Sequence, residues 1–284
     1  MIFMASIEKG NATPLISVIM GVYNCADTLA EALECIAVQT YSNWELVICD
    51  DGSQDTTWDV ATSFERTHPG KVVLLKNEQN MGLNCTLNRC LEYATGSLIA
   101  RMDGDDRCSP DRLEVELQAL IDNPEVDFVS SEMLFFDEHG VWGRTKSKQF
   151  PKPRDFIKKT PFCHAPCLVK RTVFDAVEGY SVSKRLLRVE DYHLWVKIYE
   201  KGYRGMNIQM PLYQMRDDRD AQSRKKLRYR INEAYVKAYA IKHLKLPVYY
   251  YPLCMRPILV GILPSSIYRI LHRRKARISV DVDR

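Results

Sequence analysis

Short apolar runs alternate with amphipathic segments along the first half of the chain. Each run is continuously apolar, which is typical of a strand buried on both faces of a sheet. Between the runs, apolar residues recur at helical spacing, with Asp27 and Ser109 expected as N-caps and Pro110 at a first helical position. The pattern predicts the α/β class, with a mainly parallel sheet flanked by helices. The predicted strands are residues 16–20, 44–48, 72–75 and 98–100, and helices are expected to begin near Asp27, Asp55, Asn80 and Pro110.

The pattern is less regular between residues 123 and 215. Asn123-Pro124 ends one helix, and a histidine and glycine at 139–140 sit at the centre of a predicted hairpin. Residues 146–161 are basic and contain prolines, so they predict a mobile loop with a short helix. Further strands are expected at residues 126–130 and 163–169, the hairpin at 133–145, and helices at 173–177 and 189–199.

The character of the chain changes after residue 215. The sequence has 40 Lys or Arg and 36 Asp or Glu, but they are unevenly distributed. Residues 224–284 contain 15 basic and 3 acidic residues, and residues 1–223 contain 25 basic and 33 acidic residues. Residues 227–244 predict one long basic helix. The apolar, tyrosine-bearing segment 246–264 is interrupted by four prolines and an arginine, so it is a poor membrane-spanning helix. A folded domain is therefore expected at 1–215, followed by a helical, basic and aromatic extension at 216–284.

The extension has two open interpretations. Tyrosines, apolar side chains and basic residues together suit a segment that lies on an anionic membrane surface. Alternatively, the same residues form a helical pair that packs on the body or on a second subunit. No recognised nucleic-acid-binding module is present, so nucleic acid is not an expected partner.

The nine cysteines predict reduced thiols in the cytoplasm. Their number is odd and no Cys-x-x-Cys pair occurs. The apolar run at the N-terminus is too short for a signal peptide. Cys163, His164 and Cys167 have the residue types of a metal site, but structural zinc needs four ligands and no second pair stands nearby. Packing is the preferred explanation for this cluster.

Carboxylates follow two of the predicted strands. Asp50 and Asp51 come after the second, and Asp103 and Asp105 come after the fourth. The carboxyl ends of parallel strands meet at one edge of a sheet, so the two pairs are expected to line one site. Acids this close repel one another unless a cation lies among them, which predicts Mn²⁺ or Mg²⁺. Asp106 is the acid least expected to touch the metal.

The order of the motifs resembles bacterial family 2 glycosyltransferases of the GT-A fold, over residues 14–215. No Gly-x-Gly-x-x-Gly follows the first strand and no phosphate-binding P-loop occurs, which argues against a dehydrogenase and a P-loop enzyme. The series comprises Ile16–Asn24, Gln39–Glu45, Asp50–Thr56, Asn80–Leu83, Ala100–Asp106, Pro110–Glu114, Asn123–Glu125 and Glu190–Trp195.

The resemblance implies a role for each residue on the donor side. Gly21 to Tyr23 would lie along the nucleotide base, and Asp51 would accept a hydrogen bond from it. An ionised carboxylate only accepts, so Asp51 suits the N–H of uracil or thymine. Asp103 would reach the ribose, and Asp105 would bind the metal that bridges the donor diphosphate.

On the acceptor side, the resemblance assigns the catalytic base of an inverting transfer to Asp191, with Glu190 beside it. Acids are favoured at the start of a helix whatever the function, so one of the two could be structural. His164 is expected either near the acceptor cleft or as a buried structural imidazole. Residues 214–219 lack the histidine that many relatives carry there, so no third metal ligand is assigned.

These features predict a metal-dependent, hexosyltransferase-type enzyme that uses a nucleotide sugar, most simply a UDP-sugar. A Gln-x-x-Arg-Trp signature of processive synthases is missing, so one sugar is expected per encounter. The expected acceptor is a glycan or lipid-linked precursor, and the expected location is the cytoplasm, peripherally on the inner face of the cytoplasmic membrane. The alternatives are a catalytically silent scaffold that binds nucleotide sugar or membrane, and a nucleotidyltransferase.

Overall fold

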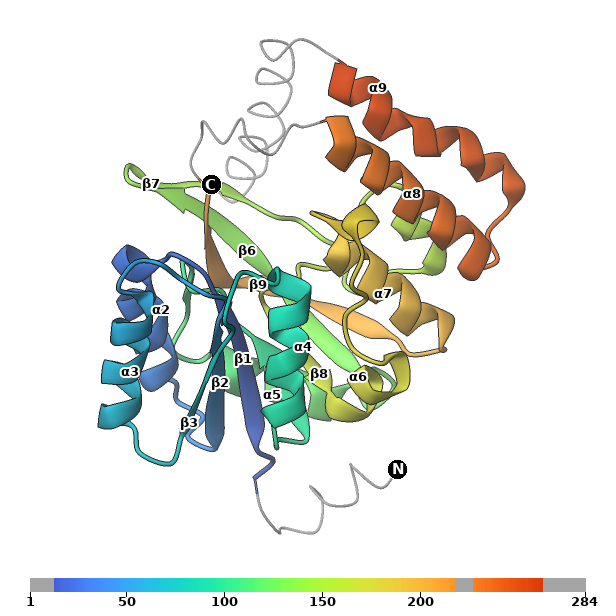
Figure 1. The fold of residues 1–284 in the computed structure, drawn as a ribbon. Coiled ribbons are helices and arrows are strands. Elements are labelled where there is room, and N and C mark those ends of the chain that lie inside the picture. The colour runs from blue at the N-terminus through green and yellow to red at the C-terminus, as the bar shows by residue number, and fades with distance from the viewer. Residues whose placement is uncertain (1–12, 218–226, 263–284) are drawn as a thin grey trace.

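The computed structural model describes residues 13–217 and 227–262. Within these residues, nine strands form one sheet in the order β3-β2-β1-β4-β8-β6-β9-β5, and β7 pairs with β6. Figure 1 shows helices on both sides of this sheet. The strands are β1 (Ile16–Val22), β2 (Trp44–Asp50), β3 (Val72–Lys76), β4 (Leu98–Arg101), β5 (Arg107–Cys108), β6 (Phe128–Asp137), β7 (Gly140–Arg144), β8 (Cys167–Lys170) and β9 (Gly205–Arg216).

The sheet has a parallel half and a mixed half. Strands β3, β2, β1 and β4 are parallel, with Ile16 opposite both Trp44 and Leu98. Strand β8 is antiparallel to β4 and β6, whereas β9 runs parallel to β6. The predicted α/β class and flanked sheet are confirmed, and the hairpin expected around residue 139 is formed by β6 and β7. The carboxyl ends of β1, β2 and β4 lie at one edge, as the acid pattern requires.

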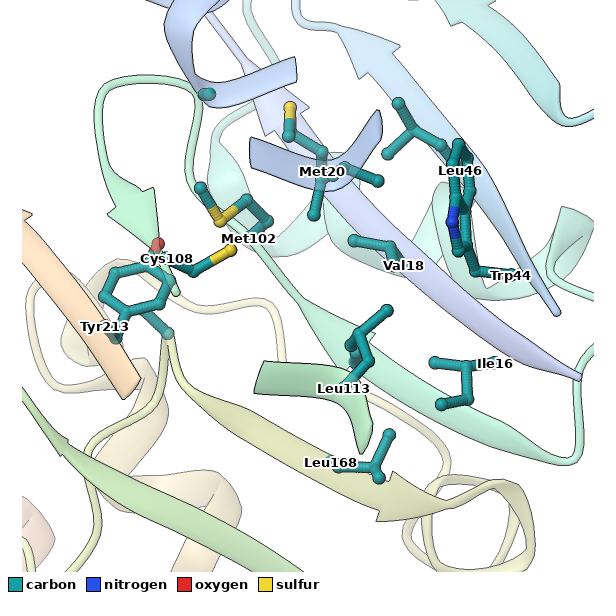
Figure 2. Packing of buried hydrophobic residues seen from close by; sticks show 14 of the residues in the cluster. Ile16, Val18, Met20, Trp44, Leu46, Met102, Cys108, Leu113, Leu168 and Tyr213 are labelled. Carbon is teal, nitrogen blue, oxygen red and sulfur yellow. The ribbon is translucent and has the colours of Figure 1, made fainter. Parts of the chain in front are cut away.

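The helices cover the two faces of the sheet through two apolar clusters. Ile16, Val18 and Met20 of β1 pack with residues of α2 and α5, and Figure 2 shows Leu113 and Leu168 close to them. The opposite face of β1 presents Ile19 to a cluster that includes residues of α4, α6 and α7. The α-helices are α2 (Ala26–Ala37), α3 (Thr57–Thr67), α4 (Leu83–Tyr93), α5 (Arg112–Asp122), α6 (Arg171–Val177), α7 (Glu190–Glu200), α8 (Leu227–His243) and α9 (Arg256–Ile262), and the short 3-10 helices are η1 (Pro153–Ile157), η2 (Lys184–Leu186) and η4 (Val248–Met255).

Two predicted helix starts are wrong by a few residues. The N-cap of α2 is Cys25, and Asp27 lies inside the first turn. The N-cap of α5 is Asp111, because Ser109 is still extended and donates its backbone N–H to Leu212 O of β9 (3.0 Å). The carbonyl of Pro110 accepts from Thr40 N at 2.8 Å, which holds that residue outside the helix as well.

The helix predicted at 227–244 is α8, and it packs against the body. Val236 and Ala240 belong to the cluster that contains α7, and Figure 1 shows the two helices side by side. Among the described residues, no helix combines the length and apolar content needed to cross a bilayer. Residues 273–277 include four Lys or Arg and lie outside the described residues. The division into 1–215 and 216–284, and the membrane role of the second part, stay predictions.

Candidate active site

The loops after β1 and β2 are joined to each other at the edge of the sheet. Asn24 N–H donates to Ser53 Oγ (3.0 Å), and Gln54 N–H donates to Asn24 Oδ1 (2.9 Å). Gly52 has a φ of 75°, and a β-carbon there would lie 2.8 Å from the backbone of Gln79, so the turn requires glycine. The Tyr23 ring, in contrast, is 46% exposed. A rigid pair of loops therefore presents one open aromatic face.

Asp51 is a buried carboxylate that organises the loop before α4. Its Oδ1 accepts from Asn77 Nδ2 and from Met81 N, both at 2.8 Å, and its Oδ2 accepts from Gly82 N at 2.9 Å. Two carboxylate oxygens offer about four acceptor positions, so one remains on Oδ2. The sequence assigned Asp51 to the base alone, whereas the structure shows that it also shapes the wall beside the base loop.

The turn after β4 places three acids around a glycine that fits closely. A β-carbon on Gly104 would lie 2.8 Å from Val22 Cγ1 and 3.1 Å from Cys25 Sγ, so the turn can approach the β1 loop only with glycine at this position. Asp103 N–H donates to the Tyr213 hydroxyl (3.1 Å), which ties the turn to β9. Geometry thus fixes the backbone that carries the two flanking carboxylates.

The acids of this turn sit in an environment that disfavours their charge. The pKa of Asp105 is raised, mainly by partial removal from water and secondly by repulsion from Asp103. Asp105 is nevertheless an exposed residue. Burial, then Asp103 and Asp105, raises the pKa of Asp106 to about 8. Asp106 Oδ1 accepts from Arg216 N at 2.7 Å. Asp106 is therefore an anchor for β9, and Asp105 is the acid that faces solvent.

Arg101, which precedes the acids, is a buried cation that connects both sides of the site. Its Nη2 lies 2.6 Å from Asp103 Oδ1, and its Nη1 lies 2.8 Å from His164 Nδ1. Arg101 also lowers the pKa of Asp191, against the stronger opposing effect of burial. Asp103 and Asp191 are thus both within electrostatic reach of one guanidinium. Two acids that are 88 positions apart in the sequence therefore feel the charge of the same arginine.

His164 is buried and has partners on both ring nitrogens. Its Nε2 lies 2.9 Å from the Tyr180 hydroxyl, and its exposed fraction is 7%. Burial and the neighbouring Arg101 charge lower its pKa, so the ring is neutral. The placement of His164 in the acceptor cleft is not supported by this geometry, and the alternative of a buried structural imidazole fits. The ring is fixed in the interior because Nδ1 contacts Arg101 and Nε2 contacts Tyr180.

Glu190 and Asp191 form the first turn of α7, as predicted. Both are half-buried, and the helix dipole favours negative charge at this position. Burial, with repulsion from Glu190, nevertheless raises the pKa of Asp191 to about 6. A carboxylate with a raised pKa is a better proton acceptor near neutrality.

A cavity of about 770 Å³ extends from the nucleotide-base loops to α7. Its lining includes Gly21, Tyr23 and Asp51, together with the loop before α4. It also includes Glu190, residues 182–184, 187 and 188 of the loop before α7, and the first residues of α8, Arg228 and Tyr229. The cavity therefore brings four of the predicted site residues to one open space, and its size suits a substrate larger than a single sugar.

The profile of the family described as Glycosyl transferase family 2 matches residues 17–177. The chain belongs to this family. It is 38% identical over 265 residues to the Bacillus subtilis (strain 168) protein EpsE, named as a glycosyltransferase, covering 93% of this chain and 95% of that one. It is 30% identical over 275 residues to an Escherichia coli UDP-Gal:alpha-D-GlcNAc-diphosphoundecaprenol beta-1,3-galactosyltransferase, covering 93% and 98%.

A solved structure shows the same fold. The mannosyltransferase PcManGT from Pyrobaculum calidifontis, in complex with GDP-Man and Mn²⁺, matches with a TM-score of 0.64 and 22% identity, over 99% of this chain and 84% of that one. The GT-A fold and the glycosyltransferase activity implied by the sequence are thus confirmed. The individual roles of the site residues stay predictions.

The site residues of this glycosyltransferase can hold a divalent metal whose remaining ligands come from the substrate. Asp105 offers an exposed oxygen ligand beside a second carboxylate, and the repulsion between them is relieved by a cation. In residues 13–217 and 227–262, no three His, Cys, Asp or Glu side chains are grouped to hold a metal alone. Mg²⁺ and Mn²⁺ in such enzymes take one or two carboxylates plus substrate phosphates, so this donor set suffices.

Three features of the glycosyltransferase site were missed in the sequence. The role of Arg101 could have been predicted from the sequence, because a charged residue at the end of a buried strand needs a partner. Tyr213 and the loop 182–188 had none, since a tyrosine in a strand and a polar loop are common everywhere. Their roles depend on which elements fold beside them.

Proposed function

We propose that the chain transfers a sugar, with inversion and one residue at a time, from a UDP-sugar to a lipid-linked or polysaccharide-precursor acceptor, with Mn²⁺ or Mg²⁺ as cofactor. The observation that carries the proposal is Arg101, which pairs with Asp103 and lies within electrostatic reach of Asp191. In this proposal Asp103 belongs to the donor side and Asp191 to the acceptor side of one centre. The Escherichia coli relative, whose name specifies UDP-Gal and a diphosphoundecaprenol acceptor, supports the substrate classes.

The donor would lie along the edge formed by β1, β2 and β4. The Tyr23 ring offers a stacking surface for the base, and the free acceptor position of Asp51 suits its N–H. Asp103 is held by Arg101 and reaches the ribose. Asp105 would hold the metal, which supplies charge stabilisation to the departing nucleoside diphosphate.

Asp191 would act on the acceptor hydroxyl. A sugar hydroxyl is too weak an acid to ionise in advance, so the proton passes to Asp191 as the oxygen attacks the anomeric carbon. The bond from that carbon to the diphosphate oxygen breaks, and its electron pair stays on the leaving group. Attack from the face opposite the leaving group inverts the anomeric centre.

The proposal is tested with a donor screen. Purified protein is incubated with UDP-, GDP- and dTDP-sugars and Mn²⁺, and release of nucleoside diphosphate is measured with and without lipid-linked acceptors. Acceptor-dependent release from a UDP-sugar is the expected result. Release with GDP-sugars alone would overturn the choice of base, and no release with any donor would favour the silent scaffold.

We propose in addition that the extension at 216–284 holds the enzyme on an anionic membrane surface, at the inner face of the cytoplasmic membrane. Support comes from Val248, Tyr249 and Leu259, whose side chains are exposed on η4 and α9. Residues 244–262 contain Lys245 and Arg256 but no acid. A chain ending at Leu244 should lose co-sedimentation with anionic vesicles. Equal sedimentation of the two chains would instead favour packing against a protein surface.

A further inference from the structure

The 770 Å³ cavity is lined by cations that the proposed chemistry does not use. They lie on the loop before α7 and at the start of α8, and we call this part of the wall the basic end. Lys184, Arg188 and Arg228 all line it, and none of them forms an ion pair with another described residue. Arg228 contacts a neutral partner, with its Nη2 3.1 Å from the Tyr229 hydroxyl. Three cations at the basic end, beside only Glu190 as an acid of the lining there, leave an excess of positive charge.

The basic end is built from two elements that are fastened together. Asn232 of α8 donates from Nδ2 to Leu187 O at 3.1 Å, which fixes the helix to the loop before α7. Arg188 has a φ of 66°, a backbone conformation that is unfavourable for a residue with a β-carbon. The chain turns there and enters α7 two residues later. The cations are therefore carried by a defined wall of the cavity.

An exposed apolar surface adjoins this wall. Leu227, Ile231 and Tyr235 of α8 are exposed, as are Leu259 and Ile262 of α9. The two helices meet closely, since a β-carbon on Gly261 would lie 2.9 Å from Arg230 Cγ and 3.4 Å from Leu227 Cδ1. The start of α8 thus belongs both to the cationic wall and to an apolar surface that leads away from it.

We propose that the basic end of the cavity binds the diphosphate of a polyprenyl diphosphate acceptor, whose hydrocarbon chain lies along the exposed surface of α8 and α9. A ligand with an anionic head and an apolar chain satisfies both features at once. The acceptor sugar on that diphosphate would then lie towards Glu190, beside the base. This inference rests on the proposed function and adds the residues that recognise the acceptor.

The donor's own diphosphate is a poorer match to these cations. Asp103 and Asp105 do not line the cavity, whereas Lys184, Arg188 and Arg228 do. A donor bound by its base and by Asp105 has its diphosphate on the acidic side. The cations are therefore left for the second substrate.

The test is a binding measurement that requires no sugar transfer. Farnesyl diphosphate is titrated into the full chain in EDTA by calorimetry, in parallel with farnesol and inorganic pyrophosphate. Lys184→Gln/Arg228→Gln removes two cations of the wall, and Lys201→Gln/Arg66→Gln removes one exposed lysine and one exposed arginine elsewhere. The first variant should bind farnesyl diphosphate about tenfold more weakly than the wild type, because charge-assisted contacts are lost. The second variant should bind like the wild type.

The controls distinguish binding of the farnesyl hydrocarbon chain from binding of the diphosphate head group. Farnesol and pyrophosphate should each bind more weakly than farnesyl diphosphate, and UDP with Mn²⁺ should not displace it. Undetectable binding, equal binding by both variants, equal affinity for pyrophosphate, or displacement by UDP would each overturn the inference. If farnesyl diphosphate binds as expected but no donor supports transfer, the proposed function fails and the binding site stands.

Discussion

The two sides of the cavity region differ in the kind of ionisable side chain that they present. On the donor side, Asp103, Asp105 and Asp106 crowd one turn, and the pKa values of the last two are raised. On the acceptor side, Lys184 and Arg228 line a wall without an acidic partner among the described residues. Because Asp103 is paired with Arg101, the exposed Asp105 on one side and the cations on the other are the charges that a bound ligand can balance.

The difference teaches which substrate each side is suited to. An acidic turn with one exposed carboxylate selects a cation, and through the cation a diphosphate. A cationic wall selects an anion directly. Arg101 stands between the two sides, where it pairs with Asp103 and favours the ionised form of Asp191. Changing one side should therefore affect one substrate more than the other.

The largest expected effect is on the acceptor side. Asp191→Asn removes the proposed proton acceptor but keeps the size of the side chain, so transfer should fall by about 10²–10⁴-fold. Metal-dependent binding of the donor nucleotide, measured by calorimetry, should be nearly unchanged. Transfer at the wild-type rate would remove Asp191 as the base, and loss of donor binding would show that the two sides are not separable.

A smaller effect with the opposite selectivity is expected from Asp105→Ala. The variant loses the exposed ligand, so UDP binding in Mn²⁺ should weaken by about tenfold to a hundredfold, while binding in EDTA should be unchanged. Asp111→Ala, at the N-cap of the following helix, serves as a control that removes an acid of the same loop region. An Asp105→Ala enzyme with the metal dependence of the wild type would exclude Asp105 as a ligand.

The pH dependence of transfer should reveal the raised pKa of Asp191. The pKa of this group is raised to about 6, so its basic form is lost as the pH falls through that value. The rate should fall about tenfold for each pH unit below it, because only the ionised carboxylate accepts the proton. A pH profile of transfer at saturating donor checks this. A flat rate between about pH 5 and pH 7 would contradict the assignment.

The acids of the site were largely predictable from the sequence, and the cations of the cavity wall were not. Continuous apolar strands that end in acids place Asp51 and Asp103 at one edge by the geometry of a parallel sheet alone. The loop 182–188 has no periodicity, and its cations matter only because α8, more than 40 residues later, folds against it. Likewise, nothing in the helical pattern shows that Arg112 is fully buried with Glu116 and donates to Arg101 O at 2.8 Å. Both features depend on contacts between residues that are far apart in the sequence, which a local pattern does not show.

The smallest expected effect comes from His164, which supports the residue between the two sides. His164→Leu removes the acceptor of the Arg101 N–H (2.8 Å) without touching either substrate, so transfer should slow by about threefold to tenfold. Because a displaced Arg101 no longer favours ionised Asp191, the acidic limb of the pH profile should move to higher pH. Tyr180→Phe, which removes only the partner of Nε2, should leave the profile nearly in place. A slower His164→Leu enzyme with an unshifted profile would mean that His164 acts on stability alone, and that Arg101 does not couple the donor side to the acceptor side.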